Sequence, residues 1–194
     1  MNILLLGPAR PEIIECITRS GDEVKVTEEK LLLDSPIIQE IDFLISYGYR
    51  HILKPSILTH FPEKAINIHI SLLPWNRGAD PNFWSFLEDT PKGVTIHYLD
   101  EGVDTGDILV QTETEFTNQD TLRTSYNKLT KIAIDLFQDS WLKIRDRKIN
   151  PKAQPAGGSV HRLRDRERYQ HLLTKGWDTP VVNLIGRALD DCRE

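Results

Sequence analysis

The chain has 194 residues, of which 39% are hydrophobic and 27% are charged, and these values are typical of one globular domain with a sizeable core. Its formal net charge of −5 argues against a nucleic-acid partner, and no apolar run approaches the ~20 residues of a membrane span. The two cysteines, Cys16 and Cys192, are too far apart in the sequence to indicate a disulfide framework or a zinc site, so we expect a cytoplasmic protein without a metal.

The first 71 residues alternate between short apolar runs and segments with apolar residues at helical spacing. Strands are predicted at residues 2–7, 23–28, 42–48 and 65–71. Helical segments are predicted at residues 11–21, 35–41 and 54–61. Strands that alternate with helices predict an α/β domain with a mostly parallel, twisted sheet flanked by helices.

After Pro74 the sequence becomes loop-like, and a short helix is predicted around Trp84. Two further strands are predicted at residues 93–99 and 107–116, and the segment between them is rich in Asp and Gly, which favour turns. The longest helix is predicted over residues 120–147, because apolar residues recur there at helical spacing behind an aspartate that can cap the helix.

The charge is distributed unevenly along the chain. Ten of the 24 Lys and Arg residues lie between positions 141 and 176. This range also contains a linker-like stretch rich in Pro and Gly. Such a basic segment is most often a solvated face and less often a phosphate-binding surface.

The stretch INIHISLLP (residues 66–74) places polar side chains at every second position of a predicted strand. Asn67 and His69 therefore point to the same face, at the strand end where open α/β sheets bind ligands. An amide dipole beside a proton carrier suits acyl chemistry, in which a carbonyl becomes an oxyanion and an amine loses a proton. The alternative is two polar residues at a strand end that bond loop backbone, and spacing alone favours this alternative.

An imidazole catalyst usually works with a carboxylate that orients it. The loop after the strand at 93–99 offers four candidates: Asp100, Glu101, Asp104 and Asp107. Because Asp-rich turns are common without a catalytic role, spacing alone does not show which of them lies near His69.

Two stretches taken together resemble the 10-formyltetrahydrofolate-dependent formyltransferases: NIHISLLPWNRGADP (67–81) and GVTIHYLDEGVDTGDIL (93–109). That family has an Asn-x-His motif followed about forty residues later by an Asp-x-Gly loop, and Asn67, His69 and Asp104 fill these positions. The resemblance decides against the alternative above. It implies a Rossmann-like formyltransferase fold in which Asn67 stabilises the oxyanion and His69 shuttles the proton. Asp104 holds His69 in its working state and orients a water.

The resemblance also implies a site for 10-formyltetrahydrofolate as formyl donor. The stretch SYGYRHILKPSIL (46–58) resembles the segment whose backbone recognises the pteridine ring, and the loop after residue 99 forms the opposite wall. Donor-binding residues are therefore expected at His51, Ile52, Leu53, Asp100, Glu101, Gly102 and Val103. Two features depart from the family: Ile70 replaces the usual proline, and the N-terminal half is shortened, without a clear counterpart of the phosphate-binding glycine loop.

The stretch LPWNRGADPNFWSFLEDTPKGVTIHY (73–98) is most similar to the amino-sugar N-formyltransferases, which act on nucleotide-linked amino sugars. Arg77 is a candidate partner for phosphate, and Asn76 and Asn82 are candidates for sugar hydroxyls. Trp75 either stacks on the acceptor or packs. His97 is interpreted as a packed histidine rather than a second catalyst, and no metal site is expected.

We therefore expect a catalytic domain over residues 1–150 and a basic tail over residues 151–194 that packs on or near the active site. Whether the tail closes over the acceptor or forms a charged surface helix stays open. The expected function is N-formylation of a nucleotide-linked amino sugar. The alternatives are formylation of another small amine such as glycinamide ribonucleotide, formylation of methionyl-tRNA, hydrolysis of 10-formyltetrahydrofolate, and a folate-binding remnant without activity. Family members often pair, so a homodimer is a further expectation.

Overall fold

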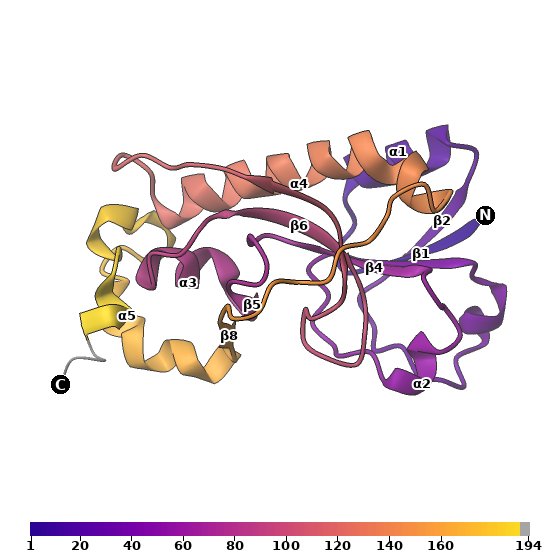
Figure 1. Cartoon of the computed structure of the whole chain (residues 1–194), viewed down its shortest axis with the longest axis horizontal. Helices are drawn as coiled ribbons and strands as arrows, with labels where there is room; N and C mark the ends of the chain where they lie inside the picture. Colours follow the sequence, from indigo (N-terminus) through magenta and orange to yellow (C-terminus); the bar gives the residue numbers. More distant parts are fainter. Residues whose placement is uncertain (191–194) are drawn as a thin grey trace. The chain divides into compact units, whose positions relative to one another are not determined.

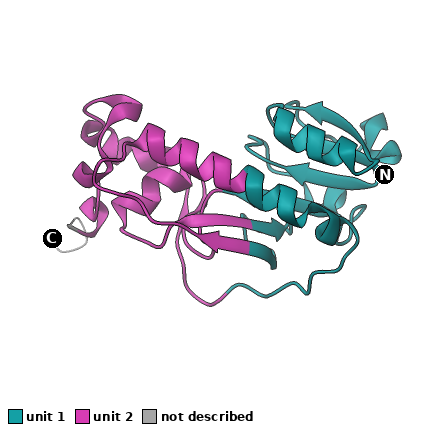
Figure 2. Cartoon of the chain, turned by 90° about the horizontal axis from the view of Figure 1, so that it is seen from above, with its two compact units in different colours: residues 1–69, 96–110, 134–154 teal, residues 70–95, 111–133, 155–194 magenta. Residues whose placement is uncertain are grey.

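The computed structural model describes residues 1–190 (Figure 1), which fall into two compact units (Figure 2). Unit 1 comprises Met1–His69, Ile96–Val110 and Ile134–Gln154, and unit 2 comprises the remaining segments. Residues 155–190 of the predicted tail thus belong to the same unit as parts of the predicted catalytic domain. Cys192 lies outside the described residues.

A six-stranded sheet has the strand order β2-β1-β3-β4-β6-β7. Its strands are β1 (Asn2–Leu6), β2 (Glu23–Thr27), β3 (Phe43–Ser46), β4 (Ala65–His69), β6 (Gly93–Tyr98) and β7 (Ile108–Glu113). The pairs β1/β2, β1/β3 and β3/β4 are parallel. The strands β1 and β3 are almost entirely buried, as expected of parallel strands covered on both faces. The predicted mostly parallel α/β fold is confirmed.

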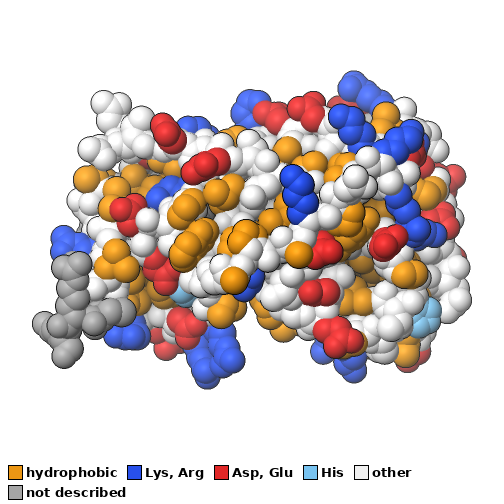
Figure 3. Space-filling model, in the orientation of Figure 1, with side chains coloured by type: hydrophobic (Ala, Val, Ile, Leu, Met, Phe, Trp, Pro, Cys, Tyr) orange, Lys and Arg blue, Asp and Glu red, His pale blue; other side chains and the backbone are white. Residues whose placement is uncertain are grey.

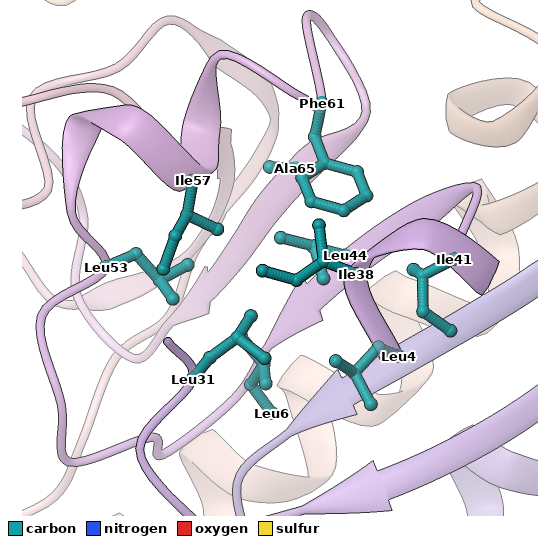
Figure 4. Close-up of a cluster of buried hydrophobic side chains, with 10 residues drawn as sticks. All are labelled: Leu4, Leu6, Leu31, Ile38, Ile41, Leu44, Leu53, Ile57, Phe61 and Ala65. Carbon is teal, nitrogen blue, oxygen red and sulfur yellow. The ribbon is translucent and has the colours of Figure 1, made fainter. Parts of the chain in front are cut away.

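Helical segments cover both faces of the sheet in unit 1. They are α1 (Pro11–Arg19), the 3-10 helix η1 (Pro36–Glu40), α2 (Pro55–Leu58) and the C-terminal part of α4 (Leu122–Arg145). On one face, Ile38 of η1 and Ile57 of α2 share a hydrophobic cluster with Leu4, Leu44 and other strand residues (Figure 4). Successive strand residues point to opposite faces, so the side chain of Phe43, next to Leu44, points to the other face of the sheet.

On that other face, the Phe43 ring meets the edge of Trp141 of α4 at a centroid distance of 5.3 Å. Gln138 Nε2 of the same helix donates to the carbonyl oxygen of Glu12 in α1 at 3.3 Å. Although α4 has 24 residues, its exposed face is polar, and no helix within residues 1–190 is long and apolar enough to span a bilayer.

Unit 2 is built from short elements around an aromatic core. They are β5 (Arg77–Gly78), α3 (Pro81–Leu87), β8 (Val160–His161), the 3-10 helices η2 (Leu163–Leu172), η3 (Gly176–Asp178) and η4 (Val181–Asn183), and α5 (Arg187–Asp190). The core contains Phe83, Trp84, Phe86, Leu87, Leu122, Tyr169, Val181 and Leu184. Three of these eight residues come from the predicted tail, so that segment completes the core of unit 2.

The pairing of β5 with β8 joins the tail to the loop after β4 in parallel register, Arg77 with Val160 and Gly78 with His161. Gly78 has a φ of +87°, and a Cβ at this position would lie 2.3 Å from the carbonyl oxygen of His161. Only glycine allows this approach. The His161 ring stacks on Trp84 at a centroid distance of 3.9 Å, which fixes β8 against α3.

Candidate active site

Two of the predicted site residues lie at the carboxyl end of β4. Asn67 is in register with Ser46 of the parallel strand β3, so it lies at the sheet edge where open α/β folds bind ligands. The alternation of β4 places His69 on the same face as Asn67. Asn67 is half-buried and His69 is buried.

Asp104 reaches this edge from the loop between β6 and β7. Its φ of 52° is uncommon for a residue other than glycine and is held in place by the surrounding loop. Asp100 Oδ1 accepts hydrogen bonds from Gly102 N at 3.1 Å and Thr105 Oγ1 at 2.7 Å. Gln154 Nε2 donates to the carbonyl oxygens of Asp104 and Gly106, both at 2.8 Å. These hydrogen bonds therefore hold the loop on both sides of Asp104.

The side chains of Asn67, His69 and Asp104 form one polar cluster within unit 1. Asn67 Nδ2 donates to Asp104 Oδ1 at 3.0 Å, and His69 Nδ1 lies 3.7 Å from Asp104 Oδ2. The side chains of His69 and Asp104 are 8% and 13% exposed. Charge interactions are stronger in such a weakly solvated site than in water.

His97 of β6 is the fourth member of the cluster. It is fully buried, in agreement with the interpretation as a packed residue, but its Nε2 lies 3.4 Å from Asp104 Oδ1 and 3.4 Å from Asn67 Nδ2. Its Nδ1 lies 2.7 Å from the carbonyl oxygen of Tyr98. A carbonyl only accepts, so Nδ1 carries a proton. Nε2 then accepts from Asn67 when His97 is neutral and donates to Asp104 when it is charged.

The predicted donor-binding residues fall on two loops of unit 1. The Ile52 side chain is 80% exposed and that of Val103 is 44% exposed, whereas the Leu53 side chain is buried in the cluster of Figure 4. Leu99, which precedes the second loop, packs against the same cluster. Both loops therefore start from one core, and Leu53 can offer a ligand only its backbone.

The predicted acceptor-binding residues lie in unit 2. Asn76 is fully buried, and its Nδ2 donates to Thr90 Oγ1 at 2.7 Å while its Oδ1 accepts from Ser159 Oγ at 3.4 Å. Both ends of the amide are thus bonded inside the unit, which argues against the predicted contact of Asn76 with a sugar hydroxyl. Trp75, which directly precedes Asn76, is in contrast partly exposed.

Arg77 and Asn82 differ in their surroundings. Arg77 is half-buried in β5, and its backbone N donates to the carbonyl oxygen of Ser159 at 3.0 Å. Asn82, on α3, is buried and donates from Nδ2 to the carbonyl oxygen of Leu122 at 3.1 Å. Within residues 1–190 its Oδ1 has no hydrogen-bond partner.

Many charges of the basic segment have acidic partners in the same unit. In unit 1, Arg145 pairs with Asp22, and Arg147 with Glu63. In unit 2, Arg166 Nη1 lies 3.1 Å from Asp80 Oδ2. On the face drawn in Figure 3, basic and acidic side chains are interspersed. These pairs favour a structural role for most of the segment. No group of three or more His, Cys, Asp or Glu side chains within residues 1–190 is arranged to hold a metal.

Comparison with known proteins gives one family and several solved structures. The sequence pattern of the formyl transferase family matches residues 25–139. The crystal structure of the formyltransferase PseJ from Anoxybacillus kamchatkensis, in complex with UDP-4,6-dideoxy-4-formamido-L-AltNAc and tetrahydrofolate, is similar with a TM-score of 0.95 and 54% identity over 97% of this chain and 100% of that chain. A 4-N formyltransferase from Francisella tularensis has a TM-score of 0.74 at 21% identity over 86% and 78% of the two chains, which shows a shared fold.

Similar sequences among characterised proteins are methionyl-tRNA formyltransferases. That of Anaeromyxobacter dehalogenans is 34% identical over 148 residues, which are 75% of this chain and 46% of that protein. That of Listeria monocytogenes is 38% identical over 109 residues, which are 56% of this chain and 35% of that protein. The chain thus spans less than half of the length of these relatives.

Proposed function

Because the chain belongs to the formyl transferase family, we propose that it transfers the formyl group of 10-formyltetrahydrofolate to the amino group of a nucleotide-linked amino sugar. The observation that carries the proposal is the cluster of Asn67, His69 and Asp104, with the carboxylate 3.0 Å from the amide and 3.7 Å from the imidazole. The choice of acceptor is supported by the likeness to PseJ, whose structure contains a formylated UDP-sugar and tetrahydrofolate.

In this reaction the formyl carbon moves from N10 of the folate to the acceptor nitrogen, and one proton moves from that nitrogen to N10. A transition state of this kind carries negative charge on the formyl oxygen and positive charge on the attacking nitrogen. The protein must therefore supply a hydrogen-bond donor to the oxygen and a route for the proton.

Asn67 supplies the donor. Its amide nitrogen carries two hydrogens, and one of them bonds Asp104 Oδ1 at 3.0 Å. The second hydrogen serves the developing oxyanion whenever His97 Nε2, 3.4 Å away, does not accept it. The bond to Asp104 fixes the plane of the amide before substrate arrives, which is the arrangement that stabilises a transition state at low reorganisation cost.

His69 moves the proton. Its Nδ1 lies 3.7 Å from Asp104 Oδ2, and we assign the contact with substrate to Nε2. The carboxylate stabilises the imidazolium that forms when His69 accepts a proton. Asp104 therefore acts on His69 through charge and on Asn67 through a hydrogen bond.

We assign the folate ring to the two loops of unit 1. Ile52 and Val103 expose apolar side chains there, which suits contact with a flat ring. We propose that these residues hold the donor. Both proposed substrates are charged and water-soluble, so we place the enzyme in the cytoplasm.

A second candidate is formylation of methionyl-tRNA, which the sequence relatives favour. The net charge of −5 argues against it, because affinity for a polyanion depends on basic contacts with phosphate. Hydrolysis of 10-formyltetrahydrofolate is a third candidate, since the same cluster can activate water.

The test is a mass-spectrometric screen of the purified protein with 10-formyltetrahydrofolate and a panel of acceptors. The panel contains UDP- and dTDP-linked amino sugars, glycinamide ribonucleotide, methionyl-tRNA and a water-only control. We expect one formyl group to be added to a nucleotide-linked amino sugar. Formylation of only the tRNA, or release of formate in the control alone, would replace the proposal with the second or third candidate.

A further inference from the structure

The segment that follows α4 runs antiparallel to the start of β7 in unit 1. Ile108 N donates to the carbonyl oxygen of Lys152 at 2.8 Å, and Lys152 N donates to that of Ile108 at 2.9 Å. Ile108 is the first residue of β7, and the loop that carries Asp104 directly precedes it. Gln154 lies two positions beyond this bridge, so main-chain hydrogen bonds hold it beside the Asp104 loop.

The Gln154 side chain holds the main chain on both sides of Thr105. Its Nε2 lies 2.8 Å from the carbonyl oxygen of Asp104 and 2.8 Å from that of Gly106. A side-chain amide nitrogen carries two hydrogens, so each carbonyl can receive one of them. One half-buried side chain therefore fixes the direction of both peptide groups.

The backbone conformation of Asp104 makes this support important. Its φ of 52° lies in the left-handed region, which residues with a side chain rarely adopt and keep only where the surroundings impose it. Asp100 holds the loop from within, through Gly102 N and Thr105 Oγ1. Gln154 is 50 positions away in the sequence and contacts the carbonyl group of Asp104 itself.

A change of φ at Asp104 would move its carboxylate, because the Cα–Cβ bond turns with the main chain. The carboxylate lies 3.0 Å from Asn67 Nδ2, 3.4 Å from His97 Nε2 and 3.7 Å from His69 Nδ1. A displacement of about 1 Å would break the hydrogen bond to Asn67, and a misplacement of about 1 Å in a catalytic arrangement can lower the rate by about 10²-fold.

We propose that Gln154 is a positioning residue for formyl transfer. It fixes the main chain of Asp104 and thereby holds the carboxylate against Asn67 and His69, and it contacts neither substrate. This inference rests on the proposed function, because it assigns a further residue to the same cluster.

The first test is steady-state kinetics of Gln154→Met, which keeps the length of the side chain and removes both hydrogen bonds. We expect kcat to fall about 10- to 100-fold, while KM for donor and acceptor changes less than about threefold because no substrate contact is lost. Gln154→Lys, which retains a donor nitrogen, should recover part of the loss. The matched control is Gln138→Met, which removes a glutamine bond to the carbonyl oxygen of Glu12 in the same unit and should leave kcat unchanged.

A double-mutant cycle with Asp104→Asn separates positioning from a general loss of structure. In the Asp104→Asn background, Gln154→Met should lower kcat less than about threefold, because the carboxylate that Gln154 positions is already absent. A merely structural role would give the same fall in both backgrounds.

Hydrogen exchange followed by mass spectrometry gives a readout that needs no substrate. Peptides that cover residues 98–108 should exchange faster in Gln154→Met than in the native protein and in Gln138→Met, because opening of the loop exposes bonded amides such as Tyr98 N and Gly102 N. Exchange in β1 and β3 should stay unchanged. If it rises because Gln154→Met has unfolded, Gln154→Glu takes its place, since that variant keeps the size and polarity of the side chain but lacks the donor.

Three results would overturn the inference: an unchanged kcat in the folded variant, an equal fall of kcat in both backgrounds, or a raised acceptor KM with an unchanged kcat. The inference and the proposed function fail separately. If the native protein formylates no amine, the proposed function is wrong, and loop exchange decides whether Gln154 holds Asp104. If an amino sugar is formylated equally fast by Gln154→Met, only Gln154 is wrongly assigned.

Discussion

The polar cluster of unit 1 and a cavity of about 260 Å³ in unit 2 are built in different ways. The cluster takes its four side chains from two short segments, residues 67–69 and 97–104, and its polar atoms bond one another. The cavity is lined by residues from position 70 to position 177, and two buried atoms of these residues, Asn82 Oδ1 and Arg166 Nε, lack a partner within the described chain. The comparison teaches that strand geometry can bring the polar groups of a cluster together from short segments, whereas the cavity wall depends on the packing of segments far apart in the chain.

The largest expected effect comes from the cluster. His69→Ala removes the proton carrier, and we expect turnover to fall by about 10²–10⁴, the usual contribution of general acid–base catalysis. Binding of the folate donor should change less than about threefold, because the donor loops do not include His69. Steady-state kinetics and donor calorimetry measure the two quantities. The exposed His60, which bonds only its own helical turn, provides the matched control His60→Ala.

A smaller effect is expected for His97, to which we assign the positioning of Asp104 because its Nε2 lies 3.4 Å from Asp104 Oδ1. His97→Phe keeps the ring but removes the contact of Nε2 with Asp104 Oδ1, and turnover should fall about 10- to 100-fold with little change in KM. His97→Gln, which can still donate, should recover part of the loss and give a pH profile closer to the native one. Equal activity of the Phe variant and the native enzyme would show that His97 only packs.

The sequence pattern was sufficient to predict the fold but only part of the cluster. The period-two pattern of Asn67 and His69 was sufficient to place both on one strand face, and alternating strands and helices were sufficient for the parallel sheet. Asp104 could be assigned only through the family resemblance, because its approach depends on a loop with a φ of 52°. His97 was interpreted from its place in a strand alone, and nothing in its spacing indicated that its Nε2 faces a carboxylate.

The side chains of unit 2 were harder to predict because their partners are distant in sequence. Asn76 is bonded by Thr90 and by Ser159, which is 83 positions away, and a polar residue in a loop-like stretch gives no sign of such burial. Trp177 and Tyr126 are brought together by the 3-10 helices of the tail, and these short elements have weak sequence signals.

A substitution of Asn76 tests whether its amide stabilises unit 2, as the structure indicates, or contacts the acceptor, as the sequence predicted. If its amide holds unit 2 together, Asn76→Ala leaves buried partners unsatisfied and lowers the free energy of unfolding by about 1–3 kcal/mol, while KM for the acceptor stays unchanged. Asn118→Ala, at an exposed position of the same unit, should change stability by less than about 0.5 kcal/mol. Denaturant unfolding measures both. An unchanged stability with a raised acceptor KM would favour the contact predicted from the sequence.

The smallest effect concerns Glu88, whose Oε2 lies 3.2 Å from His161 Nε2. Burial raises the pKa of Glu88, but hydrogen bonds from His161 and Ser159 outweigh it, so the pKa lies below the usual 4.5. A lowered pKa in the folded state stabilises the protein above pH 4.5, and this contribution is lost as the pH falls through the folded value. Glu88→Gln should therefore melt slightly below the native protein at pH 7 and approach it near pH 3. A difference that grows toward low pH would contradict the assignment.

The most direct test of the central claim is single-turnover formyl transfer by native enzyme and Asp104→Asn. Each protein is mixed with donor carrying a ¹³C-labelled formyl group and with the UDP-linked 4-amino form of the sugar found in PseJ, and labelled product is followed by mass spectrometry. We expect both proteins to bind both substrates and only the native enzyme to form labelled amide rapidly, with the variant slower by about 10²-fold or more. Equal rates of label transfer would contradict the account, because the cluster would then not carry the chemistry.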